Sequence, residues 1–133
     1  MTRTCIIVDD EPLARNLLSE YVRKVPELEL LKAFGNPLEA LNFLRENKVD
    51  ILFLDIQMPG LSGMDVVKRL QSDVMPLVIF ATAHDEFALQ AFDINAVDYL
   101  LKPIDAAGVE RALDRARERI LTRGASVDAK GPV

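Results

Sequence analysis

The sequence predicts an α/β domain built on a doubly wound parallel sheet, and three observations predict it. Short apolar runs alternate with helix-like segments along the 133 residues. The runs are apolar at successive positions, which is typical of strands that helices cover on both faces. Polar residues stop the strongest runs abruptly, and in open α/β sheets the carboxyl ends of the strands carry the ligand site.

Five segments are predicted to form the strands. Four of them are rich in Ile, Leu, Val and Phe, and a weaker one lies between the first two. In chain order the segments are residues 5–8, 28–34, 51–54, 77–81 and 97–101. Apolar runs of this length, bounded by polar residues, favour buried parallel strands.

Five helices are predicted in the intervening segments. The first lies between Pro12 and Pro26, where the apolar residues Leu13, Leu17 and Tyr21 recur every four residues. The second has Asn36 at the N-cap, Pro37 at the first helical position and a capping-box-like acid, Glu39, at the third. The apolar stripe of the second helix is predicted to be Leu38, Leu41 and Leu44.

The last three helices are predicted over residues 63–70, over residues 85–92, and onward from Asp105, a candidate cap. The buried face of the last helix is predicted to be Val109, Leu113, Ala116 and Ile120. Residues 124–133 show no periodicity. We therefore expect a domain over residues 1–123, followed by a flexible tail or a truncated linker to a missing domain.

The composition favours one cytoplasmic domain without a membrane partner. A net charge of −5 argues against a nucleic-acid surface, because phosphate backbones are bound by clustered Lys and Arg. No apolar run is long enough to span a bilayer, and no secretory signal opens the chain. Because Cys5 is the single cysteine and His84 the single histidine, neither an internal disulfide nor a multi-histidine metal site is expected.

Three carboxylates are expected to converge where two strands end. Asp9 and Asp10 follow the first apolar run, and Asp55 follows the run at residues 51–54. If those strands are neighbours, the carboxylates repel one another, and a hard divalent cation such as Mg²⁺ would relieve the repulsion. An aspartate can also act as a nucleophile and form an aspartyl phosphate.

Two further strand ends carry groups suited to phosphoryl transfer. Lys102 could offset charge on the transferring group, and Thr82 could donate a hydrogen bond to a phosphate oxygen. Taken singly, Asp9 and Asp10 could be the acids of a helix N-terminus, and Lys102 a solvated lysine. Together, the five residues predict a site for phosphoryl transfer.

A family resemblance rests on four segments in order along the chain. They are residues 6–12 (IIVDDEP), 54–63 (LDIQMPGLSG), 79–83 (IFATA) and 98–103 (DYLLKP). These segments resemble the receiver domains of bacterial two-component response regulators. The resemblance implies a flavodoxin-like (CheY-like) five-stranded parallel sheet with strand order 2-1-3-4-5. It also implies a domain that takes a phosphoryl group from a sensor histidine kinase and then changes conformation.

The resemblance assigns roles to individual residues around the phosphoryl group. Asp55 would be the phosphoacceptor. Asp10 would bind Mg²⁺ directly, Asp9 mainly through water, and Gln57 through its backbone carbonyl. The domain would act on its own aspartate and would not be an enzyme toward other substrates.

The remaining roles fall on the ends of the last two strands. Thr82 and Lys102 would hold the phosphoryl group, and Tyr99 would turn inward when Thr82 moves. The Lys102-Pro103 bond would be cis, a geometry found almost entirely at proline. Tyr99 could instead be a core aromatic.

A narrower resemblance concerns residues 82–92 (TAHDEFALQAF), which are similar to receivers of the LytR/AlgR group. Members of that group usually carry a C-terminal LytTR DNA-binding domain, so DNA would be bound only through such a domain. Residues 87–92 are very apolar, and with the last strand and helix they are expected to form a phosphorylation-dependent homodimer. Arg111, Arg115 and Arg119 are interpreted as a solvated helix face.

Other functions remain as alternatives. A stand-alone receiver could act by protein–protein interaction. A metal-dependent hydrolase with an aspartyl-phosphate intermediate commonly has a second acid where this chain has Gln57, which cannot do acid–base work. A nucleotide-binding domain is disfavoured because no Gly-rich phosphate loop follows any predicted strand.

Overall fold

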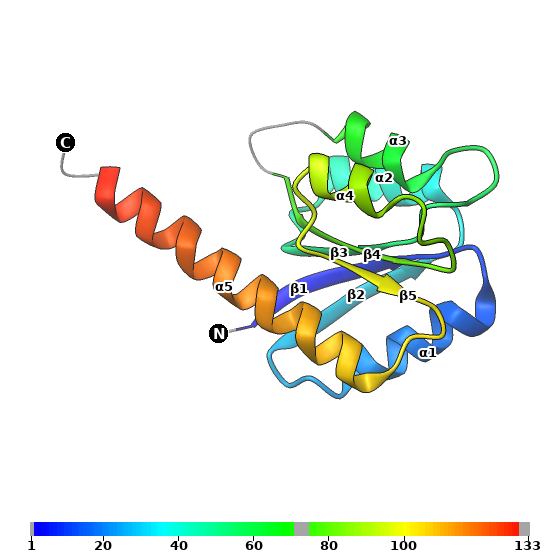
Figure 1. Cartoon of the computed structure of the whole chain (residues 1–133), viewed down its shortest axis with the longest axis horizontal. Helices are drawn as coiled ribbons and strands as arrows, with labels where there is room; N and C mark the ends of the chain where they lie inside the picture. The colour runs from blue at the N-terminus through cyan, green and yellow to red at the C-terminus, as the bar shows by residue number, and fades with distance from the viewer. Residues whose placement is uncertain (1, 71–74, 131–133) are drawn as a thin grey trace.

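The computed structural model describes the backbone of residues 2–70 and 75–130, with side chains in these ranges up to Thr122. It confirms the predicted sheet, whose five parallel strands have the order β2-β1-β3-β4-β5 (Figure 1). The strands are β1 Arg3–Val8, β2 Leu28–Phe34, β3 Ile51–Leu54, β4 Leu77–Thr82 and β5 Asp98–Leu101. The helices are α1 Pro12–Arg23, α2 Pro37–Glu46, α3 Gly63–Arg69, α4 Ala88–Asp93 and α5 Ala106–Lys130.

Two apolar layers sandwich the sheet, which explains why its central strands are apolar at successive positions. Helices α1 and α5 cover one face, and α2, α3 and α4 cover the other (Figure 1). In β3, Leu52 packs into the layer of α2, α3 and α4, whereas Ile51 and Phe53 pack into the layer of α1 and α5. Successive strand side chains point to opposite faces, so a strand covered on both sides needs apolar residues throughout.

In the apolar row of α1, Tyr21 packs against the core, whereas Leu13 and Leu17 are exposed. Leu13 is 85% exposed, whereas Leu18 and Val22 are fully buried against the sheet. The helix carries two apolar rows side by side, and the buried row is the one that continues past the helix into Val25. Spacings of four and then three residues keep Leu18, Val22 and Val25 on one face.

The N-cap predicted for α2 is confirmed, but part of its stripe is not. The Asn36 Oδ1 atom accepts hydrogen bonds from the backbone N–H groups of Leu38 and Glu39, at 2.8 and 3.4 Å. Leu41 is buried as expected, whereas Leu38 is 53% exposed. Leu38 lies in the first turn of α2, and Pro37 and Ala40 occupy buried positions on the helix instead.

Helix α4 is shorter than predicted because residues 85–87 form a turn. The backbone N–H of Ala88 donates to the carbonyl of Asp85 at 3.3 Å, and the helix begins only at Ala88. Asp favours such turns because its side chain competes for nearby backbone groups. Helix α3, in contrast, begins at Gly63 as predicted.

Helix α5 is longer than predicted and continues through Lys130, so residues 124–130 are helical. No proline interrupts the segment before Pro132, and Ala125 and Ala129 favour helix. Residues 131–133 lie outside the described residues. The predicted buried face of α5 is confirmed, and the Asp105 carboxylate accepts a hydrogen bond from the Gly108 N–H at 2.7 Å.

The arginine row on α5 is not simply a solvated face. Arg111 Nε and Arg115 Nη1 lie 3.0 and 2.9 Å from the two carboxylate oxygens of Asp98, a buried residue of β5. Arg119 donates to the backbone carbonyl of Asn95 at 3.1 Å. The arginines therefore tie α5 to β5, because a buried carboxylate requires compensating donors. Within the described residues, no helix combines the length and apolar character that a membrane crossing requires.

Candidate functional site

The predicted site residues meet at the carboxyl edge of the sheet because the strand ladders extend past the strands. The Asp9 N–H donates to the Phe34 carbonyl and the Asp55 N–H to the Val8 carbonyl, both at 2.9 Å. At the ends of the neighbouring strands β4 and β5, the Lys102 N–H donates to the Thr82 carbonyl at 2.8 Å. These bonds align the first residues after the strands along one edge.

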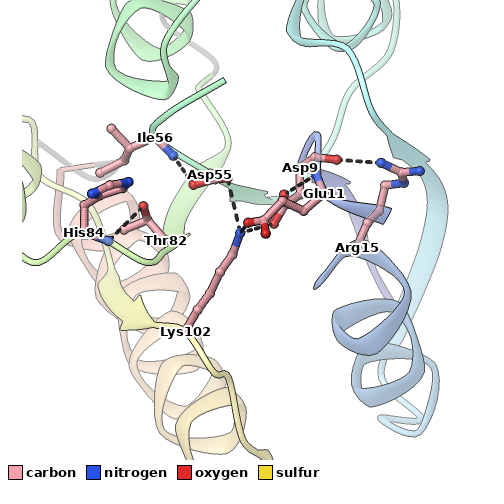
Figure 2. Close-up of polar contacts among 8 residues, drawn as sticks. All are labelled: Asp9, Glu11, Arg15, Asp55, Ile56, Thr82, His84 and Lys102. Atoms are coloured by element: carbon pink, nitrogen blue, oxygen red, sulfur yellow. Dashed lines mark hydrogen bonds and ion pairs between the residues drawn. The ribbon is translucent and has the colours of Figure 1, made fainter. Parts of the chain in front are cut away.

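Lys102 is the centre of the site (Figure 2). Its Nζ atom lies 2.9 Å from Asp9 Oδ2, 3.3 Å from Asp55 Oδ2 and 2.5 Å from Glu11 Oε1. Burial lowers the pKa of Lys102, but the hydrogen bonds to Glu11 and Asp9 and the charge of Asp55 outweigh that effect and hold the pKa above its usual value. Lys102 therefore stays charged beside three carboxylates.

The two carboxylate oxygens of Asp9 contact different groups in this cluster. Its side chain is almost fully buried, and its Oδ1 atom accepts a hydrogen bond from the Glu11 N–H at 2.9 Å. Burial raises the pKa of Asp9, more than the hydrogen bonds from Glu11 and Lys102 lower it. The burial of Asp9 shows that this part of the sheet edge is poorly solvated.

Asp55 is buried with both of its carboxylate oxygens engaged. Oδ1 accepts a hydrogen bond from the Ile56 N–H at 2.7 Å, and Oδ2 faces Lys102. The chain returns close to Asp55 at the start of α3, where the Gly63 N–H donates to the Ile56 carbonyl at 2.7 Å. A Cβ atom on Gly63 would overlap the Asp55 carbonyl oxygen, so only glycine permits this approach.

Thr82 and Tyr99 lie beside the cluster. Thr82 is fully buried at the end of β4, and its Oγ1 atom accepts a hydrogen bond from the His84 N–H at 3.4 Å. The Tyr99 hydroxyl donates to the His84 carbonyl, and the Tyr99 ring lies 6.3 Å from that of Phe80. Tyr99 thus touches the segment that follows Thr82, and burial raises the pKa of its hydroxyl. The Lys102-Pro103 peptide bond is cis, as predicted.

The acidic cluster contains one residue that was not expected. The carboxylate oxygens of Asp9, Glu11 and Asp55 lie within 4.8 Å of one another, so Glu11 joins the cluster. Glu11 was not among the predicted residues, although it directly follows the acid pair. Its contact depends on how the chain leaves β1 and enters α1, which the sequence pattern does not specify.

The residues present fit a hard divalent cation. Asp10 Oδ1 is buried and has no hydrogen-bond partner among the described residues. A buried carboxylate oxygen without a partner is costly, and oxygen ligands of this kind are the ones Mg²⁺ prefers. Gln57, expected to contribute its backbone carbonyl, lies two residues after Asp55 with its side chain exposed.

Comparison with known proteins identifies the family. Residues 5–114 match the family model described as the response regulator receiver domain. The chain belongs to this family. The acidic cluster, Thr82 and Lys102 are thus the polar edge of a receiver domain.

Two proteins of similar sequence support this family membership. The receiver is 42% identical over 126 residues to an uncharacterized response regulatory protein of Shewanella oneidensis, covering 95% of this chain and 53% of the relative. It is 43% identical over 113 residues to the transcriptional regulatory protein BtsR of Escherichia coli K12, covering 85% of this chain and 47% of BtsR. The chain therefore spans about half the length of these relatives.

Solved structures show the same fold. The response regulatory domain of MrkE from Klebsiella pneumoniae is 36% identical and superposes with a TM-score of 0.81, covering 87% of this chain and 96% of that one. The receiver domain of AraT from Geobacillus stearothermophilus is 27% identical with a TM-score of 0.82, covering 93% of this chain and 99% of that one.

Proposed function

We propose that this receiver accepts a phosphoryl group from a sensor histidine kinase onto Asp55. The observation that carries the proposal is the setting of Asp55, a buried carboxylate at a strand end with Lys102 Nζ 3.3 Å from one oxygen. A carboxylate oxygen of Asp55 attacks the phosphorus, the phosphorus–nitrogen bond of the donor phosphohistidine breaks, and the electron pair leaves with the histidine nitrogen.

The chain's own residues would stabilise the transferring group. Lys102 supplies a fixed positive charge, and the Thr82 hydroxyl lies at the neighbouring strand end, where it can donate to a phosphate oxygen. Asp9, Asp10 and Asp55 would hold Mg²⁺, with the Gln57 backbone carbonyl as a further ligand. When bound, the ion would offset charge on the phosphoryl oxygens.

The phosphoacceptor can be tested with acetyl phosphate, a small phosphoryl donor, in the presence of Mg²⁺. Intact mass should show one added phosphoryl group on the wild type and none on Asp55→Asn. The matched control is Asp93→Asn, an identical chemical change at an exposed residue of α4, which should label like the wild type. Undiminished labelling of Asp55→Asn would overturn the assignment.

The metal site can be tested by thermal denaturation. Asp10→Asn removes one of several clustered carboxylates, so without metal the variant should melt higher than the wild type. It should also lose most of the stabilisation that Mg²⁺ gives the wild type, because ligand binding to the folded state raises stability. An unchanged Mg²⁺ effect in Asp10→Asn would place the ion elsewhere.

We further propose that the receiver regulates transcription in the cytoplasm through a LytTR-type DNA-binding domain. The name of BtsR as a transcriptional regulatory protein, and the half of each relative that this chain does not cover, support this output. A stand-alone receiver that acts by protein–protein contact is the alternative. The coding sequence downstream of Val133 decides between them.

Phosphorylation would promote a homodimer through residues 87–92, β5 and α5. Leu89 and Phe92 are 81% and 80% exposed on α4, and Leu101 is 49% exposed on β5. Large apolar side chains exposed together are typical of contact surfaces. Sedimentation with beryllofluoride, a stable mimic of the phosphoryl group, should show a dimer, and a monomer in both states at high concentration would contradict this.

The receiver would act only on its own Asp55 rather than as a hydrolase. Gln57 offers no acid–base group beside the phosphoacceptor, so release of the phosphoryl group to water would be unassisted at that position. Steady turnover of phosphomonoesters that is lost in Asp55→Asn would instead favour the hydrolase.

A further inference from the structure

Arg15 contacts the loop of residues 9–11 on the side away from Lys102 (Figure 2). The Arg15 Nη1 atom donates to the backbone carbonyl of Asp9 at 2.7 Å. The arginine reaches this position from the first turn of α1, where its own N–H donates to the Glu11 carbonyl at 2.9 Å. The half-buried Arg15 thus closes a ring of hydrogen bonds around residues 9–11.

Gly35 provides the space that Arg15 occupies. A Cβ atom on Gly35 would lie 2.9 Å from Arg15 Nη1 and 3.4 Å from its Cζ atom. The backbone of Gly35 is not in the left-handed region, so a side chain at this position would be opposed by the guanidinium and not by the backbone conformation. Arg15 and Gly35, from α1 and from the end of β2, therefore form one packed unit.

This unit fixes the peptide group that leads into Asp10. The Asp9 N–H is bound to the Phe34 carbonyl, and the Asp9 carbonyl is bound to Arg15. That carbonyl lies in the same rigid peptide plane as the Asp10 N–H. Fixing the plane fixes the position of the Asp10 Cα atom, from which the side chain extends, and Asp10 Oδ1 is the buried oxygen without a partner among the described residues.

We propose that Arg15, seated against Gly35, is a positioning residue that orients Asp9 and Asp10 for the divalent cation. The inference rests on the proposed function, because it concerns the Mg²⁺ site of the phosphorylation reaction. Arg15 touches neither the cation nor the phosphoryl group and acts through the Asp9 carbonyl.

Electrostatics and positioning predict opposite effects when Arg15 is replaced. The guanidinium is a positive charge near a cation site, so its removal alone would strengthen Mg²⁺ binding. Loss of a residue that orients metal ligands weakens binding, typically by about tenfold or more. The direction of the change therefore separates the two roles.

The test is calorimetric titration of Mg²⁺ into the wild type, Arg15→Met, Gly35→Ala and the double variant. Arg15→Met should bind Mg²⁺ about tenfold more weakly than the wild type. Gly35→Ala should weaken binding in the same direction, because its methyl group displaces the guanidinium. In the Arg15→Met background, Gly35→Ala should have little further effect, since both changes remove the same contact.

The matched control is Arg23→Met, which removes the same charge from the exposed last turn of α1. It should bind Mg²⁺ like the wild type. Labelling by acetyl phosphate gives a second readout, in which the deficit of Arg15→Met should appear at low Mg²⁺ and vanish at saturating Mg²⁺.

The outcomes distinguish a failure of the positioning role of Arg15 from a failure of the proposed Mg²⁺ site. Wild-type or tighter Mg²⁺ binding by Arg15→Met, even with a lowered melting temperature, would overturn the positioning role and leave the Mg²⁺ site intact. A wild type that binds no Mg²⁺ would overturn both. If Arg15→Met does not fold, wild-type affinity in Gly35→Ala would overturn the inference.

Discussion

Helices α3 and α4 make an instructive pair, because both are short, cover the same face of the sheet and follow strands that end at the site. Helix α3 comes after Asp55 and α4 after Thr82. In α3, Ser62 and Asp65 form a reciprocal capping box, and the buried residues are Gly63, Met64, Val66 and Val67. In α4, Phe87 at the N-cap makes no side-chain capping bond within the described residues, and Ala91 is the buried residue.

The difference indicates which helix can respond to the site. Local stability follows burial and capping, so α4 is the less strongly held element and α3 the more strongly held one. Coupling between a site and a surface requires an element with two accessible arrangements. We therefore expect phosphorylation to act on α4, whose neighbour Tyr99 touches the segment after Thr82, and to leave α3 in place.

The largest effect on the free energy of unfolding should come from Gly63→Ala, at the start of α3. The added methyl group would overlap the Asp55 carbonyl oxygen and lie 3.0 Å from the Ile56 Cα atom, and both neighbours are backbone. Such overpacking should lower the free energy of unfolding by about 3 kcal/mol in urea denaturation.

The control for this variant is Gly108→Ala, also in the first turn of a helix. There the nearest atom is a side-chain oxygen of Asp105 at 3.1 Å, which can move. We expect a change in the free energy of unfolding smaller than about 1 kcal/mol. Equal losses in Gly63→Ala and Gly108→Ala would show that α3 is not fixed by its approach to Asp55.

An intermediate effect should follow from Ser62→Ala, which removes the capping box of α3. The Ser62 hydroxyl accepts a hydrogen bond from the Asp65 N–H at 3.1 Å. Its loss should cost about 1 kcal/mol of unfolding free energy in the same denaturation measurement. An unchanged stability would remove capping from the reasons why α3 and α4 differ.

The smallest effect on stability should come from α4. Phe92→Ala removes a side chain that is 80% exposed, so the free energy of unfolding should change by less than about 0.5 kcal/mol. The same variant should weaken the beryllofluoride-dependent dimer in sedimentation. Leu13→Ala, at an 85% exposed residue of α1, is the matched control and should leave the dimer unchanged. Equal weakening by both variants would place the contact elsewhere.

The strands and the site positions were predictable from the sequence for a common reason. Asp9, Asp55, Thr82 and Lys102 each stand where an apolar run stops, and parallel strands bring such positions to one edge. Glu11 and Arg15 were not predictable in this way, because their contacts depend on how α1 leaves the sheet.

The helices were harder to predict because their sequence patterns permit more than one solution. Two apolar rows run along α1, and packing buried the row of Leu18 rather than that of Leu13. The start of α4 was set by a local turn at Asp85, and α5 ran past Gly124 to Lys130. Propensity weighs little against packing and turn formation at such boundaries.

Hydrogen exchange with and without beryllofluoride tests most directly whether the site acts on α4 and not on α3. In the Mg²⁺-bound protein, beryllofluoride should change the exchange of backbone amides in residues 88–93 and leave those in residues 63–69 nearly unchanged. Asp55→Asn should show no difference in either segment. Equal changes in both helices, or a change in α3 alone, would contradict the account.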